Sequence, residues 1–205
     1  QKDVWNLYRS FLYYQAGKMS RKDFIASAEK SVNSLDQPDQ TGSRYQWLVR
    51  VFRIYLALQT HKEEAFHLEM TQLEERLLEI REQEPLLYCA YYYLMHLWKP
   101  EAAERAGALS RVRECYQNGH SHWLILWFLL QMDDSYQISV KRQEAILQQI
   151  EAGCHSPLLY LELCRLYNNT PELVLELTEA KAQALHWGLS NRILEEELQF
   201  RYAYL

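Results

Sequence analysis

Glycine and proline are scarce in this chain of 205 residues, which contains six glycines and five prolines. Most of them lie between segments of helical periodicity, so the segments themselves contain few helix breakers. Hydrophobic residues make up 48% of the chain, which is enough to bury a substantial core. The composition therefore predicts an ordered, all-α protein.

Membrane segments and disulfide frameworks are also missing from the sequence. The longest run without a charged or polar residue is 123–130, far below the roughly 20 residues that a membrane-spanning helix needs. The four cysteines include no Cys-x-x-Cys pair, and a chain that buries its own core does not need disulfides. We therefore expect free thiols, no membrane insertion and a cytoplasmic location.

Charge of one sign is not concentrated anywhere along the chain. The net charge is −5 and no block of five like charges occurs. This pattern argues against a dedicated surface for nucleic acid or anionic lipid.

Motifs of catalysis are missing too. The sequence has no Gly-x-Gly loop that could hold a phosphate, and no serine in a strand–turn–helix setting. The acidic runs 133–134 and 195–197 fit a helix cap and a solvated helix surface. We expect no enzymatic activity, no cofactor and no metal; an enzyme with an unrecognised site is the least favoured alternative.

What the sequence does contain is helical periodicity along almost its whole length, with apolar helices alternating with more polar ones. Ser20–Asp23 and Thr60–Glu63 have the spacing of capped helix starts, and residues 36–43 have the composition of a loop. The predicted helices are 3–16, 20–35, 43–59, 60–82, 85–98, 100–118, 123–132, 133–153, 157–168, 170–188 and 190–205.

Several landmarks recur with a period near 35 residues. Glycines after helix ends and serines before apolar helices recur every 34 or 35 residues: Gly119, Gly153, Gly188, Ser121, Ser156 and Ser190. Ser135 and Thr170, which begin polar helices, are 35 residues apart. The sequence Pro-Leu-Leu-Tyr at 85–88 returns at 157–160.

Two helices per period predict an α-α superhelix, or solenoid, with a helical bundle as the alternative. We expect one domain over 1–205, made of about five helix pairs and one unpaired C-terminal helix. Its predicted units are 3–42, 43–83, 84–119, 120–154 and 155–188, followed by the first helix of a next unit at 189–205.

The helix that begins at Pro157 resembles the first helix of a tetratricopeptide repeat. Tyr160, Leu163, Cys164 and Tyr167 occupy its aromatic, large, small and aromatic positions. The same positions can be aligned in four other helices, at 4-7-8-11, 48-51-52-55, 88-91-92-95 and 125-128-129-132. The resemblance implies a right-handed solenoid that binds ligands on its concave face. Cysteine fills the small position only in the last unit, and the second helices lack the family's usual marks.

A second resemblance covers the whole chain. Residues 8–12 with 16–18, and residues 156–160 with 187–188, resemble parts of large clostridial proteins of unknown function. This resemblance implies that the chain is a segment of a longer bacterial protein and implies no particular activity.

Candidate binding residues follow from the alignment of the helices. The position next to the aligned pattern forms a predicted concave row of Arg9, Arg53, Tyr93, Leu130 and Arg165, and the neighbouring row adds Leu12, Leu56, His96, Asp133 and Asn168. The candidates for ligand binding are Arg9, Arg53, Tyr93, His96, Arg165 and Asn168. Guanidinium groups offer forked donors to planar anions, so the predicted ligand is a carboxylate or an acidic peptide. The favoured alternative is that these arginines pair with glutamates of adjoining polar helices.

Two further clusters have simpler interpretations. His120, His122, Cys154 and His155 lie in two predicted turns, but zinc needs three or four converging ligands, and turn histidines are usually solvated. The 15 tyrosines fit helix packing with the hydroxyl at the rim better than a ligand platform.

The sequence thus favours a scaffold that binds a protein or peptide on the concave face of a solenoid. The alternative is a structural spacer of a larger protein that self-associates through its open ends.

Overall fold

The structure is a computed structural model that describes residues 2–35, 46–99, 101–120, 122–133, 139–168 and 171–186. These residues form α-helices and one short 3-10 turn, with no strand among them. The all-α prediction is confirmed. The helices are α1 (Lys2–Gln15), α2 (Arg21–Leu35), α3 (Gln46–Gln59), α4 (Glu63–Glu74), α5 (Leu77–Gln83), α6 (Pro85–Trp98), α7 (Ala102–Gln117), α8 (Trp123–Met132), α9 (Ser139–Glu151), α10 (Pro157–Tyr167) and α11 (Val174–His186), and the 3-10 turn is η3 (Pro171–Leu173).

Each helix predicted within the described residues is present, apart from the predicted helix 60–82, which is divided in two. The predicted loop 36–43 and the C-terminal helix 190–205 lie outside the described residues. Four predicted helix starts, at Ser121, Ser135, Thr170 and Ser190, also lie outside the described residues. So does the predicted helix end at Gly188.

Backbone contacts divide the chain into two compact units, which we describe separately. The first unit comprises Gln1–Phe11 and Ser20–Asp134, and the second comprises Leu12–Met19 and Ser135–Leu205. The prediction of one domain over 1–205 stays a prediction.

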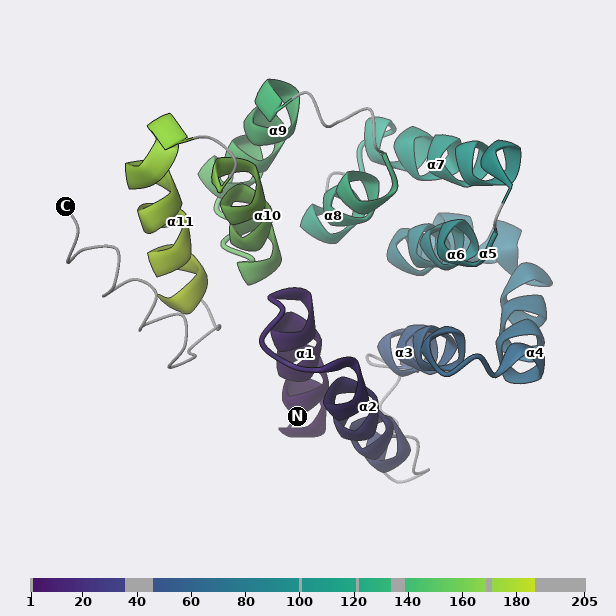
Figure 1. Cartoon of the computed structure of the whole chain (residues 1–205). Helices are drawn as coiled ribbons and strands as arrows, with labels where there is room; N and C mark the ends of the chain where they lie inside the picture. The colour runs from purple at the N-terminus through teal and green to yellow at the C-terminus, as the bar shows by residue number, and fades with distance from the viewer. Residues whose placement is uncertain are drawn as a thin grey trace. The chain divides into compact units, whose positions relative to one another are not determined.

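In the first unit, consecutive helices pack side by side (Figure 1). Contacts join α2 to α3, α3 to α4, α5 to α6, and α6 to α7. Further contacts join α3 to α6 and α6 to α8. Pairing of neighbours, together with stacking of the first helix of each pair, is the packing expected of helical repeats.

Aromatic side chains fill the interior of the first unit. The ring of Phe11 in α1 packs edge-on against Phe52 in α3 at 5.5 Å and against Trp127 in α8 at 5.7 Å between centroids. Tyr93 in α6 contacts Trp127 at 5.6 Å and stacks on Phe128 at 4.8 Å. Trp127 is 1% exposed, so these rings form a core on which α1, α3, α6 and α8 converge.

In the second unit, α10 is the central helix and packs against both α9 and α11. Its residues from Pro157 to Leu163 are all buried, including the carboxylate residue Glu162. Pro157 occupies the first turn of the helix, where its missing N–H costs nothing.

Glycines shape two of the turns that follow helices, as their sequence positions predict. Gly17 after α1 has a φ of +69°, and Gly153 after α9 has a φ of +92°. The next residue in each turn donates its N–H to a carbonyl five residues back, from Lys18 to Tyr13 and from Cys154 to Gln149. These are Schellman motifs, in which a left-handed residue lets the last helical carbonyls find donors.

Two details of helix starts show how well local signals predict boundaries. The Ser20 hydroxyl accepts the N–H of Asp23 at 3.1 Å, so the predicted start of α2 is confirmed. The predicted capping box at Thr60–Glu63 is wrong, because the Thr60 hydroxyl donates backwards to the Leu56 carbonyl at 2.8 Å. Lys62 is the N-cap of α4, with no side-chain cap.

The division of the predicted helix 60–82 occurs at Glu75 and Arg76, without a glycine or proline. Arg76 leaves the helical region with φ −110° and ψ 12° and becomes the N-cap of α5. Its guanidinium donates to both Glu79 carboxylate oxygens at 3.0 Å, which stabilises the start of the new helix. Among the described helices, none is long and apolar enough to cross a membrane.

Candidate ligand-binding pocket

In the first unit, some residues of the predicted concave row are buried by packing and are not available to a ligand. Tyr93 is 8% exposed because it stacks within the aromatic core, and Leu130 is buried as well. Arg9 is exposed on α1. His96 places its Nδ1 atom 3.4 Å from the Arg105 carbonyl oxygen.

Arg53 is engaged by a glutamate of the adjoining helix, as the alternative interpretation of the row predicts. Its guanidinium lies 3.1 Å from a carboxylate oxygen of Glu69 in α4, and Arg50 lies 3.2 Å from the other oxygen. Glu69 is therefore held by two arginines in α3, an arrangement that joins the two helices.

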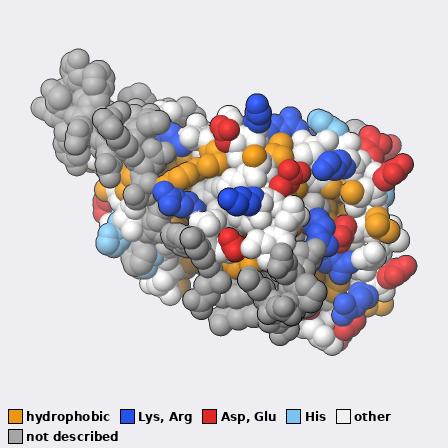
Figure 2. Space-filling model, turned by 90° about the horizontal axis from the view of Figure 1, so that it is seen from below, with side chains coloured by type: hydrophobic (Ala, Val, Ile, Leu, Met, Phe, Trp, Pro, Cys, Tyr) orange, Lys and Arg blue, Asp and Glu red, His pale blue; other side chains and the backbone are white. Residues whose placement is uncertain are grey.

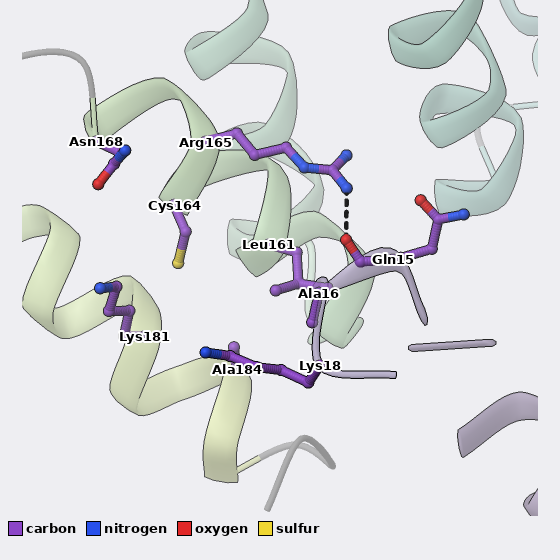
Figure 3. Close-up of a pocket in the computed structure, with 9 residues that line it drawn as sticks. All are labelled: Gln15, Ala16, Lys18, Leu161, Cys164, Arg165, Asn168, Lys181 and Ala184. Atoms are coloured by element: carbon purple, nitrogen blue, oxygen red, sulfur yellow. Dashed lines mark hydrogen bonds between the residues drawn. The ribbon is translucent and has the colours of Figure 1, made fainter. Parts of the chain in front are cut away.

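The other two candidates, Arg165 and Asn168, lie together in the wall of a pocket of the second unit (Figure 3). The pocket has a volume of about 250 Å³ and is lined by Gln15, Ala16, Lys18, Leu161, Cys164, Arg165, Asn168, Lys181 and Ala184. Three of these side chains are cationic, and no carboxylate occurs among the described residues that line it. We call this cavity the basic pocket.

Three chain segments build the basic pocket, and each has a local reason for its position. The Schellman motif at Gly17 reverses the chain after α1 and brings Lys18 to the wall. The last turn of α10 supplies Cys164, Arg165 and the C-cap residue Asn168. Helix α11 adds Lys181 and Ala184 one turn apart, on the face that packs against α10.

Arg165 joins two of these segments. It donates to the Gln15 carbonyl oxygen at 2.7 Å and to a carboxylate oxygen of Glu162, as Figure 3 shows for the first of these contacts. The second oxygen of Glu162 accepts from Arg142 in α9 at 3.1 Å. The Glu162 side chain is 2% exposed, whereas that of Arg165 is 44% exposed. The buried Glu162 carboxylate is thus shared by two guanidinium groups, which ties α9 to the last turn of α10.

Cys164 places a thiol in the wall of the basic pocket, and Figure 3 shows its sulfur directed from α10 toward α11. Burial raises the pKa of this thiol to about 11, and the Lys181 and Arg165 charges offset only part of that rise. The thiol is therefore protonated at neutral pH and is a poor nucleophile. The arrangement is suited to holding an anionic group rather than to covalent chemistry.

Two of the histidines in the predicted turns have other contacts. His122 Nδ1 accepts the N–H of Leu124 at 3.2 Å and caps α8. His155 Nδ1 lies 2.9 Å from the Tyr160 hydroxyl, and the two rings are stacked. Across the part of the chain that the structure describes, no group of three or more His, Cys, Asp or Glu side chains could hold a metal ion.

Lys18 and Lys181 of the basic pocket were not predicted from the sequence. The predicted rows used only the first helix of each pair, whereas Lys181 lies on a second helix and Lys18 in a turn. The glycine turn at Gly17 is a signal for where the chain reverses, but nothing local indicates which helix the turn meets.

Charged side chains of both signs are mixed on one face of the molecule. On the face drawn in Figure 2, lysines and arginines are interspersed with aspartates and glutamates among the described residues.

Comparisons with known proteins place the chain in one family. The family model described as the N-terminal part of a family of unknown function (DUF5717) matches residues 1–205. Neither the curated proteins nor the solved structures contain a significant match to the chain.

Proposed function

From the premise that this chain belongs to the DUF5717 N-terminal family, whose function is unknown, we propose that it is a binding scaffold without catalytic activity. Its ligand is a protein or peptide that carries acidic groups. The tetratricopeptide-like arrangement of an apolar helix followed by a polar one fits this role, because helical repeats expose long surfaces for recognition. A cytoplasmic location is part of the proposal and is supported by the four free cysteines.

The observation that carries the proposal is the basic pocket. In a chain with a net charge of −5, it brings Lys18, Arg165 and Lys181 together around one cavity. Cations beside a cavity favour an anionic partner and also increase its rate of association.

The experiment is quantitative affinity capture from cells that make the protein, with the double variant Lys18→Glu/Lys181→Glu beside the unchanged chain. The control is Lys30→Glu/Lys141→Glu, which makes the same change in net charge at two exposed lysines outside the pocket. We expect at least one partner whose recovery falls about tenfold with the pocket variant and is unchanged with the control. The proposal is overturned if every captured protein responds equally to both variants.

A structural spacer is the second candidate, and the aromatic core of the first unit favours it. Rings from α1, α3, α6 and α8 occupy the space between these helices, which would give a rigid element. A spacer that self-associates would sediment as an oligomer at micromolar concentration and would lose no partner in the capture experiment.

A further inference from the structure

We infer that the basic pocket is a site for one carboxylate carried on a short apolar stem. This inference rests on the proposed function and deepens it, because it names the chemical group of the partner that the scaffold would hold. The group could belong to a peptide C-terminus, to an acidic side chain or to a free small acid.

The charge of the pocket indicates an anion. Its cations come from three separate segments: Lys18 from the turn after α1, Arg165 from α10 and Lys181 from α11. Arg165 is fixed by Glu162 and by the Gln15 carbonyl, so its guanidinium is already oriented. Two fixed contacts use two of its five N–H donors, and a planar carboxylate matches the geometry of the others.

The size and apolar part of the pocket indicate a small group. Its volume of about 250 Å³ lies just below the ~300 Å³ at which pockets for drug-sized ligands begin. Ala16, Leu161 and Ala184 line the cavity together with the cations. A ligand of this site therefore needs a few apolar carbon atoms next to its charge.

The helix ends around the pocket favour a carboxylate over a phosphate. The pocket lies at the C-terminal ends of α1 and α10, where Gln15, Ala16 and Asn168 are located. Helix C-termini carry partial negative charge, whereas phosphates are typically bound at helix N-termini. These ends reduce the positive potential, so a monoanion is better accommodated than a dianion.

Cys164 provides a reporter within the pocket wall. Iodoacetate and iodoacetamide both alkylate a thiol: the sulfur forms a bond to the CH₂ carbon, iodide leaves, and the thiol proton passes to the solvent. Iodoacetate carries a carboxylate on a one-carbon stem, and iodoacetamide is its neutral counterpart. Cys154 serves as an internal reference because it is partly buried in the same unit and does not line the pocket.

The experiment measures the alkylation rate of each cysteine in the full chain by peptide mass spectrometry. We expect the iodoacetate-to-iodoacetamide rate ratio at Cys164 to exceed that at Cys154 by about tenfold at low salt, and to decline as salt is added. The variant Lys181→Met should lower the ratio at Cys164 several-fold, whereas Lys141→Glu should not. Equal ratios at the two cysteines would overturn the inference.

Protection assays then identify the source of the carboxylate. Propionate, a peptide with a free C-terminus and an amidated peptide with one internal glutamate are each tested for slowing the iodoacetamide reaction at Cys164. Protection by any of them supports the site, and the strongest protector identifies the source. Protection by inorganic phosphate at the same ionic strength that equals or exceeds that by the carboxylates would overturn the choice of carboxylate.

The two proposals fail in different ways. A charge preference at Cys164 without a pocket-dependent partner would overturn the scaffold function but not the carboxylate site. A pocket-dependent partner with equal alkylation ratios would overturn the carboxylate site and leave the scaffold function standing.

Discussion

At the scale of single residues, two helix N-caps behave differently from what their side chains suggest. Serine is among the best N-cap residues, yet the buried Ser156 hydroxyl at the start of α10 has no hydrogen-bond partner among the described residues. Histidine is an unusual cap, yet His122 accepts the N–H of Leu124 at the start of α8. The identity of a cap residue therefore does not by itself reveal whether it stabilises its helix.

The substitution His122→Ala should lower the free energy of unfolding by about 1 kcal/mol at pH 8, the usual cost of losing an N-cap acceptor. The matched variant Ser156→Ala should change it by less than about 0.5 kcal/mol, because no cap bond is lost. Urea denaturation, monitored by circular dichroism, measures both changes in the free energy of unfolding.

The stabilisation by His122 should also depend on pH. Burial lowers the pKa of His122 below its ordinary value of 6.5, so the folded chain favours the neutral ring that accepts the hydrogen bond. The contribution is complete above pH 6.5 and is lost as the pH falls below that value through the pKa of the folded state. The variant His122→Asn, which keeps an acceptor that does not titrate, should remove this part of the pH dependence. An equal loss for His122→Ala at pH 5 and pH 8 would contradict this role.

At the scale of secondary-structure elements, one turn motif recurs after three of the described helices. The Schellman motifs after α1 and α9 have glycine in the left-handed position. The third, after α3, has His61 there with a φ of +55°, and Lys62 donates to the Ala57 carbonyl at 2.9 Å. A side chain in this region costs energy because its Cβ approaches the backbone.

Exchanging residues at two of these turns should therefore have opposite effects. Gly153→Ala should destabilise the chain by about 1–2 kcal/mol, because a left-handed residue gains a Cβ. His61→Gly should stabilise it by about 0.5–1 kcal/mol, because the strain is relieved, although the exposed contact with Arg21 is lost. Thermal melts of both variants measure the two shifts.

Gly107 provides the control for a general effect of glycine. It lies inside α7, and a Cβ added there would meet nothing within 4 Å. Gly107→Ala should stabilise the helix by about 0.5–1 kcal/mol. If Gly153→Ala also stabilised the chain, backbone strain would not be the cause.

These turns also show what the sequence can and cannot predict about the fold. Periodicity and the glycines at 17 and 153 predicted the helices on either side correctly. At 60–63 the spacing of a capping box competed with a Schellman motif that had no glycine to mark it, and the prediction was wrong. The break at Glu75 and Arg76 was missed for a similar reason, since neither residue interrupts the apolar pattern.

The candidate site was predicted only in part, because packing between distant segments decides the rest. Arg165 and Asn168 were identified from the alignment of helices, and both line the basic pocket. Tyr93 was placed in the same row, but its large apolar ring gains more from the aromatic core than from solvent. Lys18 and Lys181 reach the pocket through tertiary contacts that no local pattern encodes.

At the scale of the whole molecule, α1 belongs to both compact units. Its residues up to Phe11 are part of the first unit, and Leu12–Met19 are part of the second. Phe11 packs against four other rings of the first unit, those of Phe24, Phe52, Tyr55 and Trp127. Because helix formation is cooperative, loosening α1 in one unit should loosen its continuation in the other.

The variant Phe11→Ala should therefore destabilise both units. We expect the free energy of unfolding of the first unit to fall by about 3–5 kcal/mol, as for other buried phenylalanines. Tryptophan fluorescence during urea denaturation measures this loss. Labelling of Cys164 by a thiol reagent, which follows the second unit, should begin at a lower urea concentration than in the unchanged chain.

Phe66→Ala is the matched control, because it removes a buried ring from a helix that belongs to the first unit alone. Phe66 is 1% exposed in α4 and stacks on Trp98 at 4.6 Å, so its loss should shift the fluorescence transition to a similar extent. Contacts between neighbours dominate the stability of helical repeats, and units can open separately. Cys164 labelling should therefore change less with Phe66→Ala than with Phe11→Ala. If the two variants shifted the labelling equally, the units would be coupled by something other than α1, and if neither shifted it, α1 would not transmit stability between them.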